Sequence, residues 1–287
     1  MTTNSADTAD TAIAKEAVEA NGAQSQRTNP PTLRLDNVSY AYAKGGKRVL
    51  KNISHDFQAG KVHAITGPSG AGKTTLFNMI TGVYDCTEGT VLFEGEKING
   101  LPTHEIAVRG IARTFQNIRL FGDLTVYDNL MTACQKNITY SLLDGILRTK
   151  KCQAQERESR AFCDQLLAEV GLSDQRDQKA NNLPYGMQRR LEIARALATC
   201  PKVILLDEPA AGMNPSETAE LMENIRRIRD TFQIAILLIE HDMNLVMNIC
   251  EGICVLNFGK VIAKGSPAEI QSNPVVIEAY LGKQKEA

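Results

Sequence analysis

The sequence predicts an α/β protein with a largely parallel, helix-covered sheet, a flanking antiparallel β-subdomain and an inserted α-helical subdomain. Three observations support this fold class. Apolar strand-like segments alternate with helix-like segments along most of the 287 residues, which is typical of parallel sheets. Residues 32–57 are rich in strand signals and poor in helix signals, which predicts the antiparallel part. Residues 117–185 show helical periodicity, which predicts the insert.

Composition bounds the class of protein. A hydrophobic content of 43% suits one or two domains with a sizeable core. The 32 basic and 33 acidic side chains nearly cancel, so no global field favours nucleic acid or an anionic membrane, although a local patch remains compatible with this balance. No apolar run approaches the roughly 20 residues that span a bilayer.

The first segment of the chain reads as a tail. Residues 1–31 are rich in Ala, Thr, Asn, Asp and Gln and lack a basic start followed by an apolar stretch, so we expect a disordered tail rather than a signal peptide.

The seven cysteines are odd in number and include no C-x-x-C pair. Neither a disulfide framework nor a zinc ribbon is indicated. Cys250 and Cys254 are four apart and could share a helical face as metal ligands, but two thiols alone make a poor site, so core positions are expected for them.

Strand signals follow in chain order. The first two cover Leu33 to Val38 and Val49 to Phe57, which are expected to pair in the antiparallel sheet. The later strands are expected at Lys61 to Thr66, Thr90 to Phe93, Ile111 to Phe115, Val203 to Leu206, Ile234 to Ile239 and Ile253 to Phe258. Within the helical insert, Phe162, Leu166 and Val170 recur every four residues and Gly171 stands where a C-terminal cap belongs.

A phosphate-binding loop follows the strand that ends at Thr66. The stretch fits G-x-x-x-x-G-K-[ST], with a helix expected from Thr75. Glycines let backbone N–H groups converge at a helix N-terminus, Lys73 adds a positive charge and Thr74 a hydroxyl for Mg²⁺. The residues expected to bind a nucleoside triphosphate here are Gly67, Pro68, Ser69, Gly70, Ala71, Gly72, Lys73, Thr74 and Thr75.

Two carboxylates end another apolar strand, at Asp207 and Glu208. Because carboxyl ends of parallel strands meet at one edge of a sheet, Asp207 is expected beside the phosphate loop, where it would hold Mg²⁺ directly or through water. Glu208 is expected to polarise a water in line with the γ-phosphate, as a general base. The plainer alternative is a strand followed by an acidic helix cap.

The next strand runs into Glu240-His241-Asp242. The imidazole of His241 has donor and acceptor capacity near neutral pH, so a hydrogen bond to the γ-phosphate is expected. The other three histidines, His55, His63 and His104, lack this context and are expected to be incidental.

The order of these motifs resembles the ATP-binding subunits of ABC transporters from Thr32 onward. The resemblance implies a P-loop, RecA-like core within an ABC domain of residues 32–287, with ATP and Mg²⁺ as cofactors. It implies that Gln116, in Arg113-Thr114-Phe115-Gln116, contacts Mg²⁺ or the attacking water. It also implies that Tyr42 stacks on adenine, with Tyr40 as a neighbour of the same chemistry.

Two further segments are identified by the same resemblance. The loop Ala211-Gly212-Met213-Asn214 matches the D-loop, and Asn214 also fits a helix cap with Pro215 and Glu217. The family's signature, which contacts nucleotide on the opposite subunit, is matched by Leu183, Pro184, Tyr185, Gly186 and Met187. This segment departs from Leu-Ser-Gly-Gly-Gln, and Pro184 removes both a hydroxyl and an N–H.

Longer segments resemble the importers of branched-chain amino acids, among them residues 110–121, 207–215, 237–246 and 273–282. The resemblance implies a peripheral ATPase at the cytoplasmic face of the inner membrane, working with a second ATPase subunit, identical or paralogous. Two membrane-spanning permeases, and indirectly a solute-binding protein, complete the implied assembly; no nucleic acid is expected.

Other readings stay open. Urea or short-chain amide importers and the lipopolysaccharide-export ATPase are close relatives of the resembled branch. A soluble ABC-type ATPase without a transporter is opposed by the single nucleotide-binding unit and by the absence of a long coiled-coil insert or strongly basic tail in the sequence. A nucleotide-gated binding module is favoured by the altered signature and opposed by Asp207, Glu208 and His241.

Overall fold

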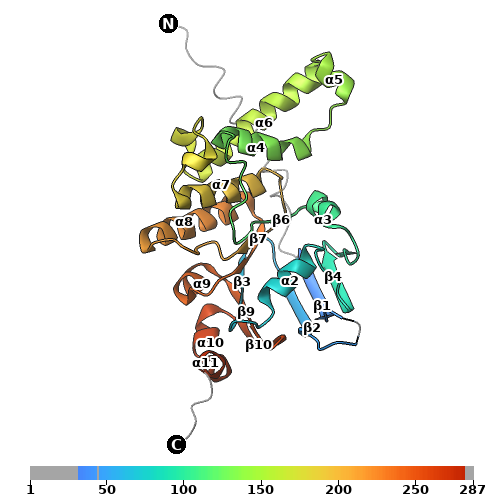
Figure 1. Ribbon diagram of the computed structural model, residues 1–287, viewed down its shortest axis with the longest axis vertical. Coiled ribbons are helices and arrows are strands. Elements are labelled where there is room, and N and C mark those ends of the chain that lie inside the picture. Colours follow the sequence, from blue (N-terminus) through green and yellow to red (C-terminus); the bar gives the residue numbers. More distant parts are fainter. Residues whose placement is uncertain (1–31, 44, 282–287) are drawn as a thin grey trace, which may run out of the picture. The chain divides into compact units, whose positions relative to one another are not determined.

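The computed structural model describes residues 32–43 and 45–281, so the tail predicted for residues 1–31 lies outside the described residues. Figure 1 shows two sheets with helices packed around the larger one. The predicted α/β fold class is confirmed. The mixed arrangement follows from strands that are apolar on both sides in the larger sheet and on one side in the smaller.

The smaller sheet is antiparallel, with the strand order β2-β1-β4-β5. Its strands are β1 (Leu33–Tyr40), β2 (Leu50–Phe57), β4 (Glu88–Phe93) and β5 (Glu96–Lys97). The predicted pairing of the first two strands is confirmed, with Leu33 opposite Phe57. The strand expected at Thr90 to Phe93 is present within β4, which pairs with β1, because its partly exposed face suits an antiparallel sheet.

The larger sheet has the order β10-β9-β3-β8-β7-β6, and every neighbouring pair except β10 with β9 is parallel. Its strands are β3 (Val62–Thr66), β6 (Ile111–Arg113), β7 (Val203–Asp207), β8 (Ala235–Ile239), β9 (Gly252–Asn257) and β10 (Lys260–Gly265). The strand expected at Ile111 to Phe115 ends two residues early, which leaves the following residues as a loop. The carboxyl ends of β3, β6, β7 and β8 therefore meet at one edge.

Two hydrophobic cores lie on opposite faces of this sheet. In β7, Ile204 and Leu206 belong to one core, whereas Val203 and Leu205 belong to the other. Alternation along a strand sends successive side chains to opposite faces, so a continuous apolar run fits a strand covered on both sides. The first core joins the sheet to helices, and the second joins it to the antiparallel sheet and α2.

Helices occupy the connections. Outside the helical segment they are α2 (Lys73–Ile80), α3 (Thr103–Arg109), α8 (Pro215–Phe232), α9 (Met243–Ile249), α10 (Pro267–Gln271) and α11 (Pro274–Leu281). The predicted cap of α8 is present: Asn214 accepts from the backbone of Glu217 over 2.9 Å, and Glu217 accepts from the backbone of Asn214 over 3.0 Å. Pro215 occupies the first turn.

Residues 126–197 form a run of helices, drawn at the upper part of Figure 1. They are α4 (Val126–Cys134), η1 (Gln135–Asn137), α5 (Leu142–Ile146), α6 (Lys150–Glu169), η2 (Ser173–Gln175), η3 (Ala180–Asn182) and α7 (Tyr185–Leu197). Gly171 has φ of 65° after α6, which is the left-handed conformation expected of a residue following a helix C-cap. Helix α7 begins at Tyr185, so Leu183 and Pro184 of the signature segment precede the helix and Tyr185, Gly186 and Met187 lie in its first turn.

The cysteines largely occupy the interior. Five are buried, namely Cys134, Cys152, Cys163, Cys250 and Cys254. Cys250 follows α9 whereas Cys254 lies in β9, so these two do not share a helical face. In the described ranges, none of the helices combines the length and the apolar character needed to cross a membrane.

Candidate nucleotide-binding site

The phosphate loop connects β3 to α2 at the sheet edge. Gly67, Gly70 and Gly72 have φ of 143°, 72° and 106°, in the region that favours glycine. A Cβ on Gly67 would lie 2.0 Å from the Leu256 carbonyl oxygen, so that position has no room for a side chain. Ser69, Gly70 and Thr74 are exposed, and the loop ends at the N-terminus of α2, where N–H groups attract anions.

The Lys73 side chain is folded over this loop. Its Nζ donates to the carbonyl oxygens of Gly67 at 2.8 Å and Pro68 at 3.0 Å. Burial lowers the pKa of the Lys73 ammonium, and the nearby Glu208 carboxylate opposes this effect. The ammonium is therefore held by the loop between β3 and α2 and lies close enough to Glu208 to be influenced by its charge.

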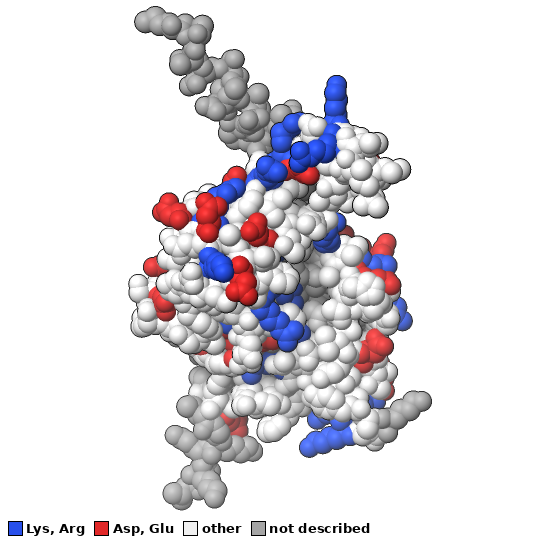
Figure 2. All heavy atoms as spheres, turned by 45° about the horizontal axis from the view of Figure 1, so that its top comes forward, with Lys and Arg blue, Asp and Glu red and all other residues white. Residues whose placement is uncertain are grey.

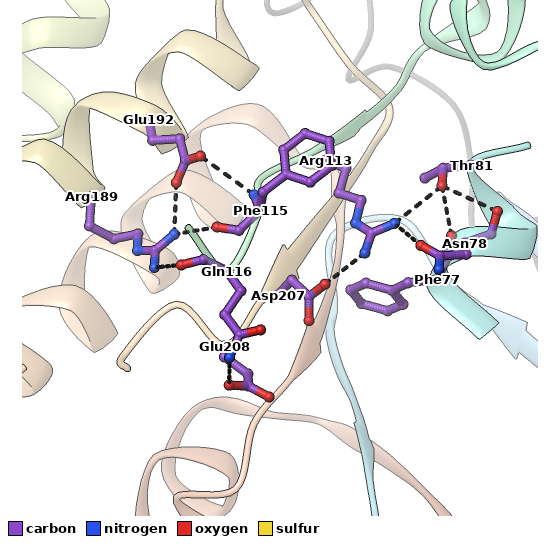
Figure 3. A network of polar contacts seen from close by, with 10 residues as sticks. All are labelled: Phe77, Asn78, Thr81, Arg113, Phe115, Gln116, Arg189, Glu192, Asp207 and Glu208. Carbon is purple, nitrogen blue, oxygen red and sulfur yellow. Dashed lines mark hydrogen bonds and ion pairs between the residues drawn. The ribbon is translucent and has the colours of Figure 1, made fainter. Parts of the chain in front are cut away.

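Asp207 is held by an arginine that the sequence did not single out. The Arg113 Nη2 donates to Asp207 Oδ2 over 2.7 Å, and both side chains are less than a tenth exposed. The same guanidinium donates to Asn78 Oδ1 on α2 over 2.7 Å and lies between the rings of Phe77 and Phe115 (Figure 3). The pair thus joins β6, β7 and α2 directly behind the phosphate loop.

Glu208 brings three predicted residues together. Gln116 Nε2 donates to Glu208 Oε2 over 2.9 Å, and His241 Nε2 lies 2.9 Å from Glu208 Oε1. The residue adopts φ of 50° and its N–H donates to the Ile239 carbonyl oxygen of β8 over 2.9 Å. This left-handed conformation ends β7 and directs Glu208 away from the strand axis. The three side chains come from the ends of β6, β7 and β8.

The structure distinguishes the two candidate tyrosines. Tyr40 is buried and stacks on Tyr84, with ring centroids 5.1 Å apart. Tyr42 is 65% exposed, and its hydroxyl lies 3.4 Å from Oγ1 of Thr75 in the first turn of α2. Of these two tyrosines, Tyr42 is therefore the exposed one, and it lies beside the helix that follows the phosphate loop.

The signature segment is divided between surface and interior. Pro184 and Tyr185 are exposed, Met187 is half-buried against the core, and Leu183 and Gly186 are buried. Pro184 is the N-cap of α7 and makes no side-chain capping bond. The Tyr185 ring lies beside Gly212, where a Cβ would be 3.6 Å from it, so the signature segment and the D-loop are neighbours.

A buried ion pair of α7 binds the Gln116 loop. Arg189 is fully buried and donates to Glu192 Oε2 over 2.7 Å. It also donates to the carbonyl oxygens of Phe115 at 2.7 Å and Gln116 at 2.8 Å (Figure 3). Glu192 Oε1 accepts from the backbone N–H of Phe115 and Arg119, at 3.5 and 3.3 Å. The helix that starts at the signature therefore fixes the backbone beside Glu208.

The C-terminal helix also reaches this edge of the sheet. The Tyr280 hydroxyl of α11 lies 2.6 Å from Oγ1 of Thr66, the buried residue that precedes Gly67. The end of the chain is thus linked to the strand that carries the phosphate loop.

Metal donors at this edge suit Mg²⁺. Among the described residues, no group of three or more His, Cys, Asp and Glu side chains could hold a metal ion. Mg²⁺ commonly takes one or two carboxylates, a hydroxyl, water and substrate phosphates, so Asp207 and Thr74 fit it without such a cluster. Two of the histidines expected to be incidental, His55 and His63, pack against Phe57, with ring centroids 4.6 and 5.4 Å from the phenyl ring.

Arg113, Arg189 and Glu192 are site residues that sequence reasoning missed. Arg113 stands in the segment that carries the resemblance, three residues before Gln116, but the predicted strand runs on to Phe115, so the sequence gives no sign that Arg113 ends it. Arg189 and Glu192 are polar residues three apart on a helix, which is an ordinary surface pattern until their burial is known.

Two segments of the chain match models of known protein families. Residues 50–211 match the ABC transporter family model, which covers more than half of the chain. Residues 260–286 match the family described as branched-chain amino acid ATP-binding cassette transporter. The first match contains the phosphate loop, Gln116, the signature segment and Glu208; the second contains Tyr280.

Curated relatives and solved structures agree with these matches. The chain is 44% identical over 253 residues to the Escherichia coli K12 high-affinity branched-chain amino acid transport ATP-binding protein LivG, covering 88% of this chain and 98% of that protein. It is 42% identical, with the same coverage, to the corresponding BraF protein of Pseudomonas aeruginosa. The crystal structure of the ADP conformation of MJ1267, an ATP-binding cassette of an ABC transporter, superposes with a TM-score of 0.75 at 32% identity, over 88% of this chain and 99% of that one. The chain therefore belongs to the ABC transporter family of ATP-binding subunits, which are ATPases.

Proposed function

We propose that this protein is the ATP-hydrolysing subunit of an ABC importer for branched-chain amino acids. The solute class is supported by the C-terminal family match and by the names of the relatives. The catalytic part is supported above all by one observation, the convergence of Gln116, Glu208 and His241 at the edge that carries the phosphate loop.

Each group at this edge has a role in phosphoryl transfer. The backbone amides of the loop and Lys73 would bind the β- and γ-phosphates, and Thr74 and Asp207 would hold Mg²⁺, which would neutralise the charge that develops on the phosphates. Glu208 accepts the proton of the attacking water as general base, while Gln116 positions that water or the metal. His241 donates a hydrogen bond to the γ-phosphate, and Tyr42 stacks on adenine.

A second ATPase subunit completes the site. The exposed Pro184 and Tyr185, at the N-terminus of α7, face the γ-phosphate held by the other subunit, where the helix dipole favours negative charge. Gly186, Leu183 and Met187 support that turn from within. The mate is a copy or a paralogue, and a pair of such subunits works with two permeases at the cytoplasmic face of the membrane, fed indirectly by a solute-binding protein.

The test uses the assembled transporter. The complex copurified with its membrane-spanning subunits is placed in proteoliposomes, and ATP hydrolysis is measured with binding protein loaded with leucine, isoleucine or valine. We expect these solutes to stimulate hydrolysis and to be taken up. Stimulation by urea or short-chain amides instead, or by lipopolysaccharide, would assign the chain to one of the related transporters. Failure to copurify with any membrane subunit would favour a soluble ATPase.

A further inference from the structure

Four large aliphatic side chains protrude around α5. Leu142, Leu143, Ile146 and Leu147 are 81%, 69%, 68% and 73% exposed. We call these four residues the α5 apolar patch. Isolated exposed leucines are ordinary, but four within six residues make a contiguous apolar surface, which marks an interaction site.

The backbone presents this patch in a fixed orientation. Ser141 and Asp144 form a capping box at the start of α5, and the Thr149 hydroxyl donates to Asp144 Oδ1 over 3.1 Å. The preceding turn is bound to α6, because Gln155 Oε1 accepts from the backbone N–H of Thr139 and Tyr140 at 3.1 and 3.2 Å. On a helix, positions i, i+1, i+4 and i+5 lie on one side, so the patch faces outward as a unit.

The rim of the patch is basic. Arg148, Lys150 and Lys151 follow it directly and are exposed. The only acidic side chain between residues 138 and 151 is Asp144, which the Ser141 and Thr149 hydrogen bonds occupy and whose pKa they lower. Figure 2 shows blue side chains gathered at the upper end of the molecule beside a white surface, over the region where α5 and α6 lie in Figure 1.

We propose that the α5 apolar patch inserts into the interface of an anionic membrane, with Arg148 and Lys150 contacting lipid headgroups. Aliphatic side chains on one side of a short amphipathic element and cations at its rim are the combination that binds bilayer interfaces. The patch contains no aromatic or hydrogen-bonding side chain of the kind that anchors protein interfaces. Charge and composition together therefore favour lipid over a protein partner.

This membrane contact is independent of the nucleotide chemistry. None of the patch residues touches the phosphate loop or the Glu208 cluster in the described hydrogen bonds. The contact would hold the helical segment at the lipid surface, in addition to any contacts between this chain and the permease subunits. It goes beyond the proposed function, and either can fail without the other.

Vesicle partition of the full chain without nucleotide tests the proposal. Flotation is measured with vesicles of phosphatidylcholine alone and of phosphatidylcholine containing one quarter phosphatidylglycerol. We expect clear preference for the anionic vesicles, weakened by salt. The L143Q/L147Q variant is expected to bind about tenfold more weakly, because its apolar area is lost. Arg148→Gln and Lys150→Gln are each expected to weaken anionic binding about fivefold.

Val108→Gln is the matched control, since Val108 is 66% exposed on α3 but lies outside the patch. All substituted side chains are exposed, so thermal unfolding and ATP binding should stay at the wild-type level. The proposal is overturned if the chain binds neither vesicle, or if L143Q/L147Q floats as well as V108Q. Equal partition into neutral and anionic vesicles overturns it too. Loss of copurification with membrane subunits without loss of vesicle binding would assign the patch to a protein partner and also overturn it.

Discussion

Arg113 and Asp207 form a buried ion pair, with Nη2 and Oδ2 2.7 Å apart, although 94 residues separate them in the chain. The carboxylate proposed to hold Mg²⁺ is thus oriented by a guanidinium from the neighbouring strand. Arg113 also contacts Asn78 in α2, so the Asp207 carboxylate and the helix that follows the phosphate loop share one anchor.

The first prediction concerns this pair. Arg113→Met should lower the free energy of unfolding by about 3 kcal/mol, because it leaves the Asp207 carboxylate buried without its cation. The double variant R113M/D207N should recover part of this loss, since the unpaired charge is gone. Urea unfolding without nucleotide measures both; additive losses would show that the two side chains are not coupled.

The second prediction concerns Glu208. Glu208→Gln should keep nucleotide binding, because the amide oxygen still accepts from Gln116 and the phosphate loop is unchanged. Steady-state ATP hydrolysis should fall by about 10²- to 10⁴-fold, the usual contribution of a general base. Glu223→Gln, on the exposed side of α8, serves as the control. Hydrolysis at the wild-type rate in E208Q would remove Glu208 from the role of base.

The third prediction compares two glycines of the phosphate loop. Gly67→Ala places a methyl group 2.0 Å from a carbonyl oxygen at φ of 143°, so it should cost at least about 3 kcal/mol of stability and abolish ATP binding. Gly70→Ala meets no atom within 4 Å at φ of 72° and should cost about 1 kcal/mol, the strain of a left-handed alanine. Thermal unfolding of the two variants checks the difference. Equal costs would mean that the contact with Leu256 is not a constraint.

The fourth prediction is a pH dependence. Burial lowers the pKa of His55 and of His63 from 6.5 to about 4, and the positive charges of Lys264 near His55 and of Lys61 near His63 add to the effect. Both are neutral in the folded state, so the stability they contribute is complete above pH 6.5 and is lost as the pH falls from 6.5 towards 4. The slope should be about 1.4 kcal/mol per pH unit for each histidine.

Urea unfolding at a series of pH values measures this slope. His63→Gln should remove half of the contribution of the two histidines between pH 6.5 and 4, since one proton-binding group of the unfolded chain is lost. Val108→Gln, an exposed substitution on α3 that changes no titratable group, should leave the slope unchanged. An identical slope in H63Q and the wild-type protein would contradict the burial argument.

Much of the site could be predicted because its chemistry lies next to strand ends. Gly67 to Thr74, Asp207, Glu208 and His241 each follow an apolar run, and parallel strands bring such ends to one edge. Arg113 and Arg189 could not be predicted, because their partners depend on the pairing of β6 with β7 and on the position of α7. The Arg189 contact to Gln116 spans 73 residues of sequence.

Two strands that the sequence does not predict, β5 and β10, lack a local signal. Strand β5 is only two residues long, and β10 contains the exposed Lys260 and Lys264. Neither strand therefore has a continuous apolar pattern in the sequence. The α5 apolar patch was missed for the opposite reason. Its leucines look like core residues in the sequence, and only the fold shows that nothing in the described chain covers them.

The Arg189 contacts would couple ATP hydrolysis at the two nucleotide sites of a dimer. One rigid helix begins with Tyr185, proposed to face the nucleotide of the partner subunit, and binds the backbone of Gln116, proposed to contact the nucleotide of its own. A shift of Gln116 after hydrolysis would therefore move Tyr185 in the other site. In such a dimer neither site turns over independently, and the rate should depend on ATP concentration in a sigmoidal manner.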